Sequence, residues 1–284
     1  MLKIWSKPGR CYAHGVSSSA FRENVILVTG ASRGIGRELA RQAAEQGAWL
    51  ALAARDAGEL EEAARECRER GGRAVALPAD VGVEADCAAL VARTVETYGR
   101  IDTLVNNAGI GMWARFDEVR DLSIFERIMR VNYLGSVYCT AHALPHLKRT
   151  RGRIVGISSL TGKTGVPTRS GYAASKHAMA GLFDSLRIEL DGTGVTVTMI
   201  YPGFVATEIR ERAFGADGQP LGKSPVREGE VMTVETCARL TLEAAAERRR
   251  ELVMTRRGKL GMWLKILAPG AVDRIAKKAI EEGR

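Results

Sequence analysis

The chain has 284 residues, of which 45% are hydrophobic and 26% are charged, and its formal net charge is +9 at pH 7. This length and composition suit one large α/β domain or two small ones. Five scattered cysteines without a C-x-x-C pair argue against a disulfide framework or a zinc site. No apolar run reaches the ~18 residues of a membrane span, and the first 21 residues lack the apolar core of a signal peptide. A soluble, cytoplasmic protein is therefore predicted.

Apolar strands alternate with helical patterns along most of the chain. The predicted strands are residues 24–30, 48–55, 73–80, 101–109, 152–159, 195–203 and 250–255, and the predicted helices include 35–47, 59–71, 87–99 and 172–190. Strands that are apolar throughout and alternate with helices indicate a parallel sheet covered on both faces. We therefore expect an α/β fold with a doubly wound, seven-stranded parallel sheet in three layers. Such a sheet binds ligands at the carboxyl ends of its strands.

No linker or internal repeat divides the chain, so one main domain is predicted. We expect an N-terminal arm at residues 1–20, a domain at 21–257 with a mobile lid at 204–230, and a C-terminal tail at 258–284. Most of the positive charge lies near the tail, because residues 248–284 hold eleven Lys or Arg against four Asp or Glu. Nucleic-acid binding is not predicted, since the core of the sequence contains no nucleic-acid motif.

The tail segment 261–280, GMWLKILAPGAVDRIAKKAI, places apolar residues among lysines and arginines. This pattern is typical of an interfacial segment attracted to anionic lipid, so a peripheral membrane contact is one hypothesis. The alternative is packing on the same molecule or at a subunit interface. The second is favoured, because Pro269 and Gly270 break the segment into two short halves.

A glycine-rich turn follows the first predicted strand, in the stretch TGASRGIG (29–36). Strand, glycine turn and helix together are the context in which a dinucleotide-binding motif is credible. Gly30 allows a tight turn, Gly34 lets the backbone approach a pyrophosphate, and Gly36 lets helix and strand pack closely. The free N–H groups of the helix N-terminus suit phosphates. A plain turn without a ligand is the alternative for this motif alone.

Further motifs follow in order: Asp80-Val81, NNAG at 106–109, Asn132 in VNYLGSV, Tyr172-x-x-x-Lys176, and YPG at 201–203. With the glycine turn, this set resembles the short-chain dehydrogenase/reductase family, classical type, over residues 24–255. The tail is similar to that of the hydroxysteroid-dehydrogenase-like branch, whose members often carry an N-terminal membrane anchor that this sequence lacks. The resemblance implies a Rossmann fold and an oxidoreductase, working as a homodimer or homotetramer.

The resemblance also implies four catalytic residues: Asn132, Ser159, Tyr172 and Lys176. Tyr172 would donate a proton to the alkoxide formed when a ketone accepts hydride, and Lys176, one turn along the helix, is expected to lower the pKa of its phenol. Ser159, thirteen residues before Tyr172, would hold the substrate oxygen, while Ser158 ends the strand. Asn132 would anchor a relay water, or else serve as a structural amide between two helices.

The same resemblance implies a cofactor site, with structural alternatives for several members. Asp80 would accept from the adenine amino group or cap the next helix, and Asn106 would lie under the ribose or brace the sheet. The residues implied to bind the cofactor are Gly30, Ser32, Arg33, Gly34, Ile35, Gly36, Arg55, Asp80, Val81, Asn106, Ala108, Gly109, Tyr172, Lys176, Pro202, Gly203, Val205 and Thr207.

The end of the second strand indicates which nicotinamide cofactor is used. Enzymes that use NAD place an acidic residue there, and family alignment puts Ala54 at that position. Arg55 follows, and Arg33 lies in the glycine turn. Two guanidiniums suit a 2′-phosphate, which arginine can grip with two hydrogen bonds, so NADP(H) is predicted. Asp56 lies two residues past the usual acidic position.

The predicted function is hydride transfer between NADP(H) and the carbonyl or secondary alcohol of a small or lipid-like substrate. Two alternatives are a 3-oxoacyl-carrier-protein type of reductase, which would want a basic docking face, and a non-catalytic NADP-binding sensor, which would not need the four catalytic residues. No metal site is predicted, because nothing completes the i,i+4 pair His142 and His146. His177 is expected to point away from the Tyr172–Lys176 face.

Overall fold

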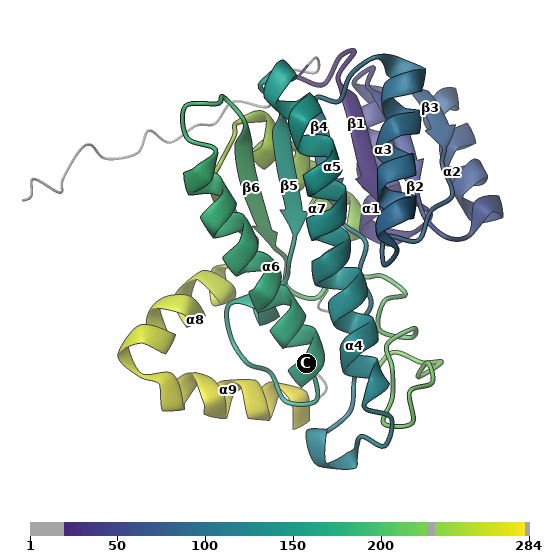
Figure 1. Cartoon of the computed structure of the whole chain (residues 1–284). Helices are drawn as coiled ribbons and strands as arrows, with labels where there is room; N and C mark the ends of the chain where they lie inside the picture. The colour runs from purple at the N-terminus through teal and green to yellow at the C-terminus, as the bar shows by residue number, and fades with distance from the viewer. Residues whose placement is uncertain (1–19, 226–230, 282–284) are drawn as a thin grey trace, which may run out of the picture.

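The computed structural model describes residues 20–225 and 231–281, which form one parallel sheet with helices on both faces (Figure 1). The seven strands lie in the order β3-β2-β1-β4-β5-β6-β7. Their bounds are β1 Val25–Thr29, β2 Trp49–Ala53, β3 Arg73–Ala76, β4 Thr103–Asn106, β5 Arg153–Ile157, β6 Thr196–Tyr201 and β7 Glu251–Val253. Each lies within a strand predicted from the sequence, so the predicted fold class is confirmed.

The strands form where the chain is apolar and buried on both faces. All five residues of β1 are buried, and the parallel register places Val28 beside Leu52 of β2 and Val105 of β4. Chain order reverses at β1, because β2 and β3 lie on one side of it and β4 to β7 on the other. A crevice for ligands forms at such a reversal, outside the carboxyl ends of the strands.

Helices cover both faces of the sheet. The side chains of β1 alternate between two buried clusters: Ile26 and Val28 pack with α1, α2 and α7, and Leu27 packs with α3, α5 and α6. The bounds are α1 Gly34–Glu45, α2 Ala57–Glu69, α3 Glu84–Tyr98, α4 Ser123–Met129, α5 Gly135–Thr150, α6 Ser170–Glu189, α7 Val234–Ala246, α8 Arg256–Leu267 and α9 Pro269–Glu281. A π-helical turn, Arg130–Leu134, joins α4 to α5, and two 3₁₀ turns span Phe116–Glu118 and Leu160–Gly162.

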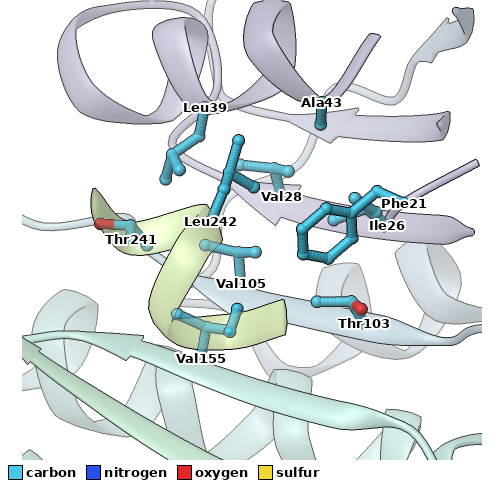
Figure 2. A pocket seen from close by; sticks show the side chains of 11 residues that line it. Phe21, Ile26, Val28, Leu39, Ala43, Thr103, Val105, Val155, Thr241 and Leu242 are labelled. Atoms are coloured by element: carbon cyan, nitrogen blue, oxygen red, sulfur yellow. The ribbon is translucent and has the colours of Figure 1, made fainter. Parts of the chain in front are cut away.

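A small gap lies in the core between the sheet and the layer of α1 and α7. Figure 2 shows Phe21, Leu39 and Leu242 among the side chains around it, and its volume is about 10 Å³. A gap of this size with an apolar lining is barely large enough for one water and offers that water few polar partners. It is a packing defect, and the ligand site has to be sought at the carboxyl end of the sheet.

The tail forms two helices that pack against each other, with Ala268 between them. The helix break predicted at Pro269 and Gly270 is confirmed, because α8 ends at Leu267 and Pro269 is the first residue of α9, where its missing N–H costs nothing. Both helices lie at the end of the molecule where α6 begins (Figure 1). The Nζ atom of Lys265 donates a 2.7 Å hydrogen bond to the carbonyl of Lys163, which ties α8 to the loop after β5.

Only part of the tail's apolar surface is packed. Val272 is buried and Met262 packs on the core, whereas several large apolar residues are 59–81% exposed: Leu260, Trp263, Ile266, Leu267 and Ile275. Among the described residues, no helix combines the length and apolar composition that crossing a membrane requires. The predicted N-terminal arm, apart from residue 20, and residues 226–230 of the predicted lid lie outside the described residues.

Candidate active site

The glycine-rich turn between β1 and α1 is packed so tightly that side chains are excluded. Gly30 and Gly34 have positive φ angles of 65° and 52°, a region that glycine adopts without strain. A Cβ atom at Gly36 would lie 2.3 Å from the carbonyl oxygen of Gly30. These contacts match the tight turn expected at Gly30 and the close packing expected at Gly36, and the N-terminal N–H groups of α1 lie at the carboxyl end of β1.

Asn107 holds this turn from the neighbouring strand, and the sequence analysis missed it. Its Nδ2 atom donates to the carbonyl oxygens of Thr29, at 2.9 Å, and Gly30, at 3.0 Å. The backbone N–H of Asn107 donates to the Thr29 hydroxyl at 3.0 Å. The signal was present in the second asparagine of the NNAG motif. Ser32 and Ile35 are half-buried in the turn, and Ile35 packs on the core.

Arg33 and Arg55 lie near each other in the fold but differ in their surroundings. The half-buried Arg33 is ion-paired with Glu59 of α2 and, at 3.0 Å, with Glu208 of the lid. Arg55 follows β2 and is exposed. Asp56 caps α2, because its Oδ1 accepts from the N–H of Glu59 at 3.0 Å. A 2′-phosphate would have to displace Glu59 and Glu208 from Arg33, whereas the exposed side chain of Arg55 is accessible from solvent.

The Asp80-Val81 pair lies in the turn between β3 and α3. The Oδ1 atom of Asp80 accepts from the N–H of Gly82 at 2.9 Å, so the side chain supports its own turn. It does not cap α3, whose preceding residue, Val83, makes no side-chain capping bond. Val81 is buried, and a Cβ atom at Gly135 would lie 2.9 Å from its side chain. Val81 thus brings the turn against the start of α5.

At the end of β4, Asn106 hydrogen-bonds α5, and Gly109 lies beside Asn132 and Lys176. The Nδ2 atom of buried Asn106 donates to the Thr140 hydroxyl of α5 at 3.1 Å, which matches the bracing alternative, and its Oδ1 has no partner among the described residues. A Cβ atom at Gly109 would lie 3.4 Å from Oδ1 of Asn132 and 3.5 Å from Nζ of Lys176. Gly109, with Ala108 beside it, therefore leaves room next to two predicted catalytic residues.

Asn132 is fully buried in the π-helical turn between α4 and α5. Its Oδ1 accepts from the N–H of Ile110 at 2.8 Å, and its Nδ2 donates to the Ile110 carbonyl at 3.0 Å and to the Ser175 hydroxyl at 2.9 Å. The side chain therefore joins the loop after β4 to α6, as the structural alternative foresaw. A π-helical turn is a common way to aim a side chain at a functional site.

Ser159 and Tyr172 meet where β5 ends and α6 begins. The Ser159 hydroxyl lowers the pKa of the Tyr172 phenol, which places the two side chains close together, and it accepts from the N–H of Thr161 at 3.2 Å. Tyr172 is 8% exposed, on the first turn of α6. Ser158 is directed to the backbone instead, since its hydroxyl donates to the Lys176 carbonyl at 3.4 Å. The choice of Ser159 over Ser158 agrees with this arrangement.

The expected lowering of the Tyr172 pKa by Lys176 is wrong for this structure. Burial raises the pKa of Tyr172 above its usual value, and Arg169 and Ser159 oppose the shift only in part. The Nζ atom of Lys176 lies 5.8 Å from the centre of the Tyr172 ring and donates a 2.8 Å hydrogen bond to the carbonyl of Ile157. Burial lowers the pKa of Lys176 to about 8. Arg169 is the cation that acts on the phenol, and the sequence analysis did not single it out.

The segment after β6 packs against residues that follow β1, β5 and β7. The Pro202 carbonyl accepts from the N–H of Leu160 at 2.9 Å, and a Cβ atom at Gly203 would lie 3.1 Å from Thr255. Val205 is buried, and Thr207 lies beside Gly34, where a Cβ atom would be 3.2 Å from the threonine methyl. Pro202 thus contacts the loop after β5, and Thr207, in the predicted lid, contacts the glycine turn.

The three histidines of the described residues contact groups outside the Ser159–Tyr172–Lys176 site. His177 contacts the Ala173 carbonyl through Nδ1 at 2.9 Å, along its own helix, as expected for a residue off the Tyr172–Lys176 face. His142 lies 3.6 Å from Glu84, and His146 contacts Arg149. Within the described ranges, no group of three or more His, Cys, Asp or Glu side chains is placed to hold a metal ion.

A doubly wound parallel sheet with a glycine turn at its switch point, and a Ser–Tyr–Lys group beside it, defines a nicotinamide-dependent oxidoreductase. The short chain dehydrogenase family model matches residues 24–217, and the chain belongs to this family. The resemblance inferred from the sequence motifs is therefore confirmed, and so is the prediction of an enzyme of the short-chain dehydrogenase/reductase type.

Individual relatives agree with the finer resemblance to hydroxysteroid dehydrogenases. The chain is 36% identical over 255 residues to 11-beta-hydroxysteroid dehydrogenase A of Sesamum indicum, covering 88% of this chain and 73% of that protein. It is 32% identical to a dehydrogenase/reductase SDR family protein 7-like of Dictyostelium discoideum, covering 92% and 83% of the two chains.

A solved structure with the same fold is an alcohol dehydrogenase from the archaeon Thermococcus sibiricus. The TM-score is 0.71 at 30% sequence identity, over 81% of this chain and 94% of the other. That enzyme is complexed with 5-hydroxy-NADP. The nucleotide in that complex is thus a derivative of the cofactor predicted here from Arg33 and Arg55.

Proposed function

We propose that this enzyme transfers hydride between NADP(H) and the carbonyl or secondary alcohol of an apolar, lipid-like substrate. The observation that carries the proposal is that Ser159, Tyr172 and Lys176 lie together at the carboxyl end of β5, with Nζ of Lys176 5.8 Å from the centre of the Tyr172 ring and Ser159 close enough to act on its phenol. The names of the hydroxysteroid-dehydrogenase relatives and the 5-hydroxy-NADP of the archaeal alcohol dehydrogenase support it.

The cofactor would lie along the crevice at the carboxyl end of β1 and β4. The N–H groups at the start of α1 would hold the pyrophosphate, and Arg55 and Arg33 would hold the 2′-phosphate. Asp80 and Val81 would flank the adenine, Asn106, Ala108 and Gly109 the ribose, and Pro202, Gly203, Val205 and Thr207 the nicotinamide end. When bound, the nicotinamide supplies or accepts the hydride.

The chain's own residues would manage the proton. The raised pKa of Tyr172 keeps its hydroxyl protonated at neutral pH, so it can donate to the developing alkoxide. Ser159, whose hydroxyl acts on the Tyr172 phenol, would hold the same oxygen. Lys176, with its pKa near 8, is poised to carry a proton near neutral pH, and Asn132 lies close enough to Gly109 to anchor a water beside it.

Apolar side chains beside Tyr172 favour an apolar substrate body. Tyr172 belongs to a buried cluster with Met112 and Ala114, against which Phe214 and Ala216 of the lid pack. The basic helix α8, which is hydrogen-bonded to the loop after β5 at Lys163, would offer the docking face that a carrier-protein reductase needs. The apolar cluster beside Tyr172 nevertheless favours a free, lipid-like substrate. A non-catalytic sensor is not supported by membership of an enzyme family.

A substrate panel followed by NADPH absorbance tests the proposal. Medium-chain and steroid-like ketones should be reduced, with Tyr172→Phe as the negative control. If no ketone is reduced and no alcohol is oxidised while NADPH still binds, the proposed activity is wrong.

We propose a homo-oligomer and a peripheral membrane contact through the exposed face of α8. Trp263, Ile266 and Leu267 are 69–81% exposed, and Lys259 and Lys265 lie on the same helix, so apolar insertion and attraction to anionic lipid would act together. A cytoplasmic enzyme held in this way could take its substrate from the bilayer.

Vesicle co-sedimentation tests this contact. The full chain should bind anionic vesicles better than neutral ones, and Trp263→Glu should lose binding while keeping its turnover in solution. Binding that ignores lipid charge or survives Trp263→Glu overturns the membrane contact. A fall in oligomer mass for the same variant would assign the surface to a second copy instead.

A further inference from the structure

Arg169 lies next to the catalytic tyrosine and immediately before α6. It is the N-cap residue of α6, and its carbonyl accepts the first helical hydrogen bond from the N–H of Ala173 at 2.8 Å. Residues three apart on a helix lie on one face, and the charge of Arg169 acts on the Tyr172 phenol. A group held by Arg169 would therefore lie within reach of a substrate whose carbonyl is held by Tyr172.

Two aromatic rings cover the Arg169 guanidinium. The Cζ atom of Arg169 lies 4.1 Å from the centre of the Trp113 ring and 5.2 Å from the centre of the Phe204 ring. Trp113 belongs to the loop between β4 and α4, and Phe204 is the first residue of the predicted lid. Stacking leaves the edges of a guanidinium, which carry its N–H donors, available for hydrogen bonds. The arrangement holds those edges in place beside the apolar cluster of Met112, Ala114 and Phe214.

Two nitrogen atoms of the Arg169 guanidinium, Nε and Nη2, are buried and make no hydrogen bond among the described residues. Arg37 and Arg187, by contrast, are paired with Glu66 and Asp184. The charged groups acting on Arg169 within the described ranges are the Tyr172 phenol and a second cation, Arg210.

A buried cation without a counter-ion is costly, because it loses its hydration and gains no charged partner. Burial, aided by repulsion from Arg210, lowers the pKa of Arg169 to about 10, so the guanidinium still carries its charge at neutral pH. Arg210 is itself held, with Nη1 donating to the Val205 carbonyl at 2.7 Å and Nε to the Ser224 hydroxyl at 3.0 Å. Arg210 lies close enough to act on Arg169, so an anion bound to Arg169 would offset both the cost of its burial and this repulsion.

We infer that Arg169 binds an anionic group of the substrate, so that the preferred substrates are oxo acids, or the matching hydroxy acids, with an apolar body. The inference rests on the proposed function and names its substrate class. A carboxylate fits the planar guanidinium with two hydrogen bonds, and a sulfonate or phosphonate shares that chemistry. The hydrocarbon between carbonyl and anion would lie on Met112, Ala114 and Phe214. Arg169 would thus be a specificity-determining residue, while Tyr172 and Ser159 act on the carbonyl.

The test compares charged and neutral forms of one carbon skeleton. Medium-chain oxo carboxylates, their methyl esters and the matched oxo sulfonates are reduced with NADPH by the parent protein and by Arg169→Gln, Arg169→Lys and Arg115→Gln. Arg115 is exposed and paired with Asp117, so its variant controls for loss of one positive charge nearby. Equal use of sulfonate and carboxylate would assign the site to anions in general, and a preference for carboxylate would assign it to acids.

The parent should favour the acid over its methyl ester by about 10- to 100-fold in kcat/KM, the range expected for a charged hydrogen-bonded pair. Arg169→Gln should remove this preference by raising KM for the acid, while leaving the ester unchanged. Arg169→Lys should keep part of the preference, and Arg115→Gln should keep all of it. An equal loss for acid and ester in Arg169→Gln would make the residue a lid clamp only, and a parent without acid preference would overturn the inference.

Binding measurements separate this inference from the proposed activity. In Tyr172→Phe, which should not turn over, calorimetry with the cofactor present should detect an oxo carboxylate and not its ester. The double variant Tyr172→Phe/Arg169→Gln should lose that binding while its Tm stays near that of Tyr172→Phe. Acid binding without any turnover by the parent would uphold Arg169 and overturn the proposed activity, and turnover without acid selectivity would do the reverse.

Discussion

Lys176 of α6 donates a 2.8 Å hydrogen bond from Nζ to the carbonyl oxygen of Ile157, the last residue of β5. Burial lowers the pKa of this lysine from 10.5 to about 8, so the native chain gives up its proton before the unfolded chain does. The unfolded chain therefore binds more protons between pH 8 and 10.5, and this group makes the protein more stable as pH rises through that window.

Comparison of the parent with Lys176→Met isolates this contribution. Between pH 7 and pH 10, the unfolding free energy of the parent minus that of the variant should rise by an amount on the order of 2 kcal/mol. Urea unfolding of both cofactor-free proteins at several pH values measures it. A difference between the two proteins that stays constant with pH would mean that Lys176 is not perturbed in the native state.

Tyr172→Phe should abolish turnover while leaving NADPH binding almost intact. The reason is that the hydroxyl transfers the proton, whereas the ring fills a buried site that phenylalanine also fills. A loss of at least about 100-fold in kcat is expected for removal of a general acid. Steady-state rates and cofactor fluorescence measure the two effects, and a variant that keeps most of its rate would show that another group supplies the proton.

NADPH should be preferred over NADH, and Arg55→Asp should erase or reverse the preference. The introduced carboxylate would repel a 2′-phosphate and could accept from a ribose diol. We expect kcat/KM for NADPH to fall by about tenfold or more, the loss typical of a charged hydrogen bond. Arg65→Asp makes the same charge change on exposed α2 and should leave the preference as it is. Equal use of both cofactors by the parent would refute the roles of Arg33 and Arg55.

Gly36→Ala and Gly181→Ala should change stability in opposite directions. A Cβ atom at Gly36 would lie 2.3 Å from a backbone oxygen that cannot move aside, so a loss of about 1–3 kcal/mol is expected. Gly181 lies inside α6 with open space where its Cβ would be, so alanine should gain about 0.5–1 kcal/mol. Thermal unfolding compares them, and two losses of similar size would contradict the packing at Gly36.

The strands could be predicted from the sequence because their signals are local. Each is a short apolar run, and glycines such as Gly30 follow several of them. The spacing of Ser159, Tyr172 and Lys176 along the chain was also enough to predict that these three residues lie together in the fold. Asn107 and Arg169 were missed because their importance arises from contacts with Gly30 and Trp113, which lie 77 and 56 positions away in the chain.

The direction of the Tyr172 pKa shift could not be predicted from the motif either. Spacing along α6 places Lys176 one turn away, but spacing cannot tell where a flexible ammonium will point. In the fold it reaches back to Ile157, and desolvation of the phenol becomes the larger effect. Burial depends on elements from the whole chain, so a motif alone does not give its size.

The π-helical turn at Arg130–Leu134 has a consequence for single-residue deletions. Such a turn holds one residue more than an α-helical turn, so removing one, for example Val131, would leave a continuous helix with α4 and α5 facing as before. The sheet would still assemble, yet the amide of Asn132 would swing away from Ile110 and Ser175. The extra residue of the π-helical turn is therefore needed to position Asn132 and not to form the fold, so we expect its deletion to leave a folded protein with reduced activity.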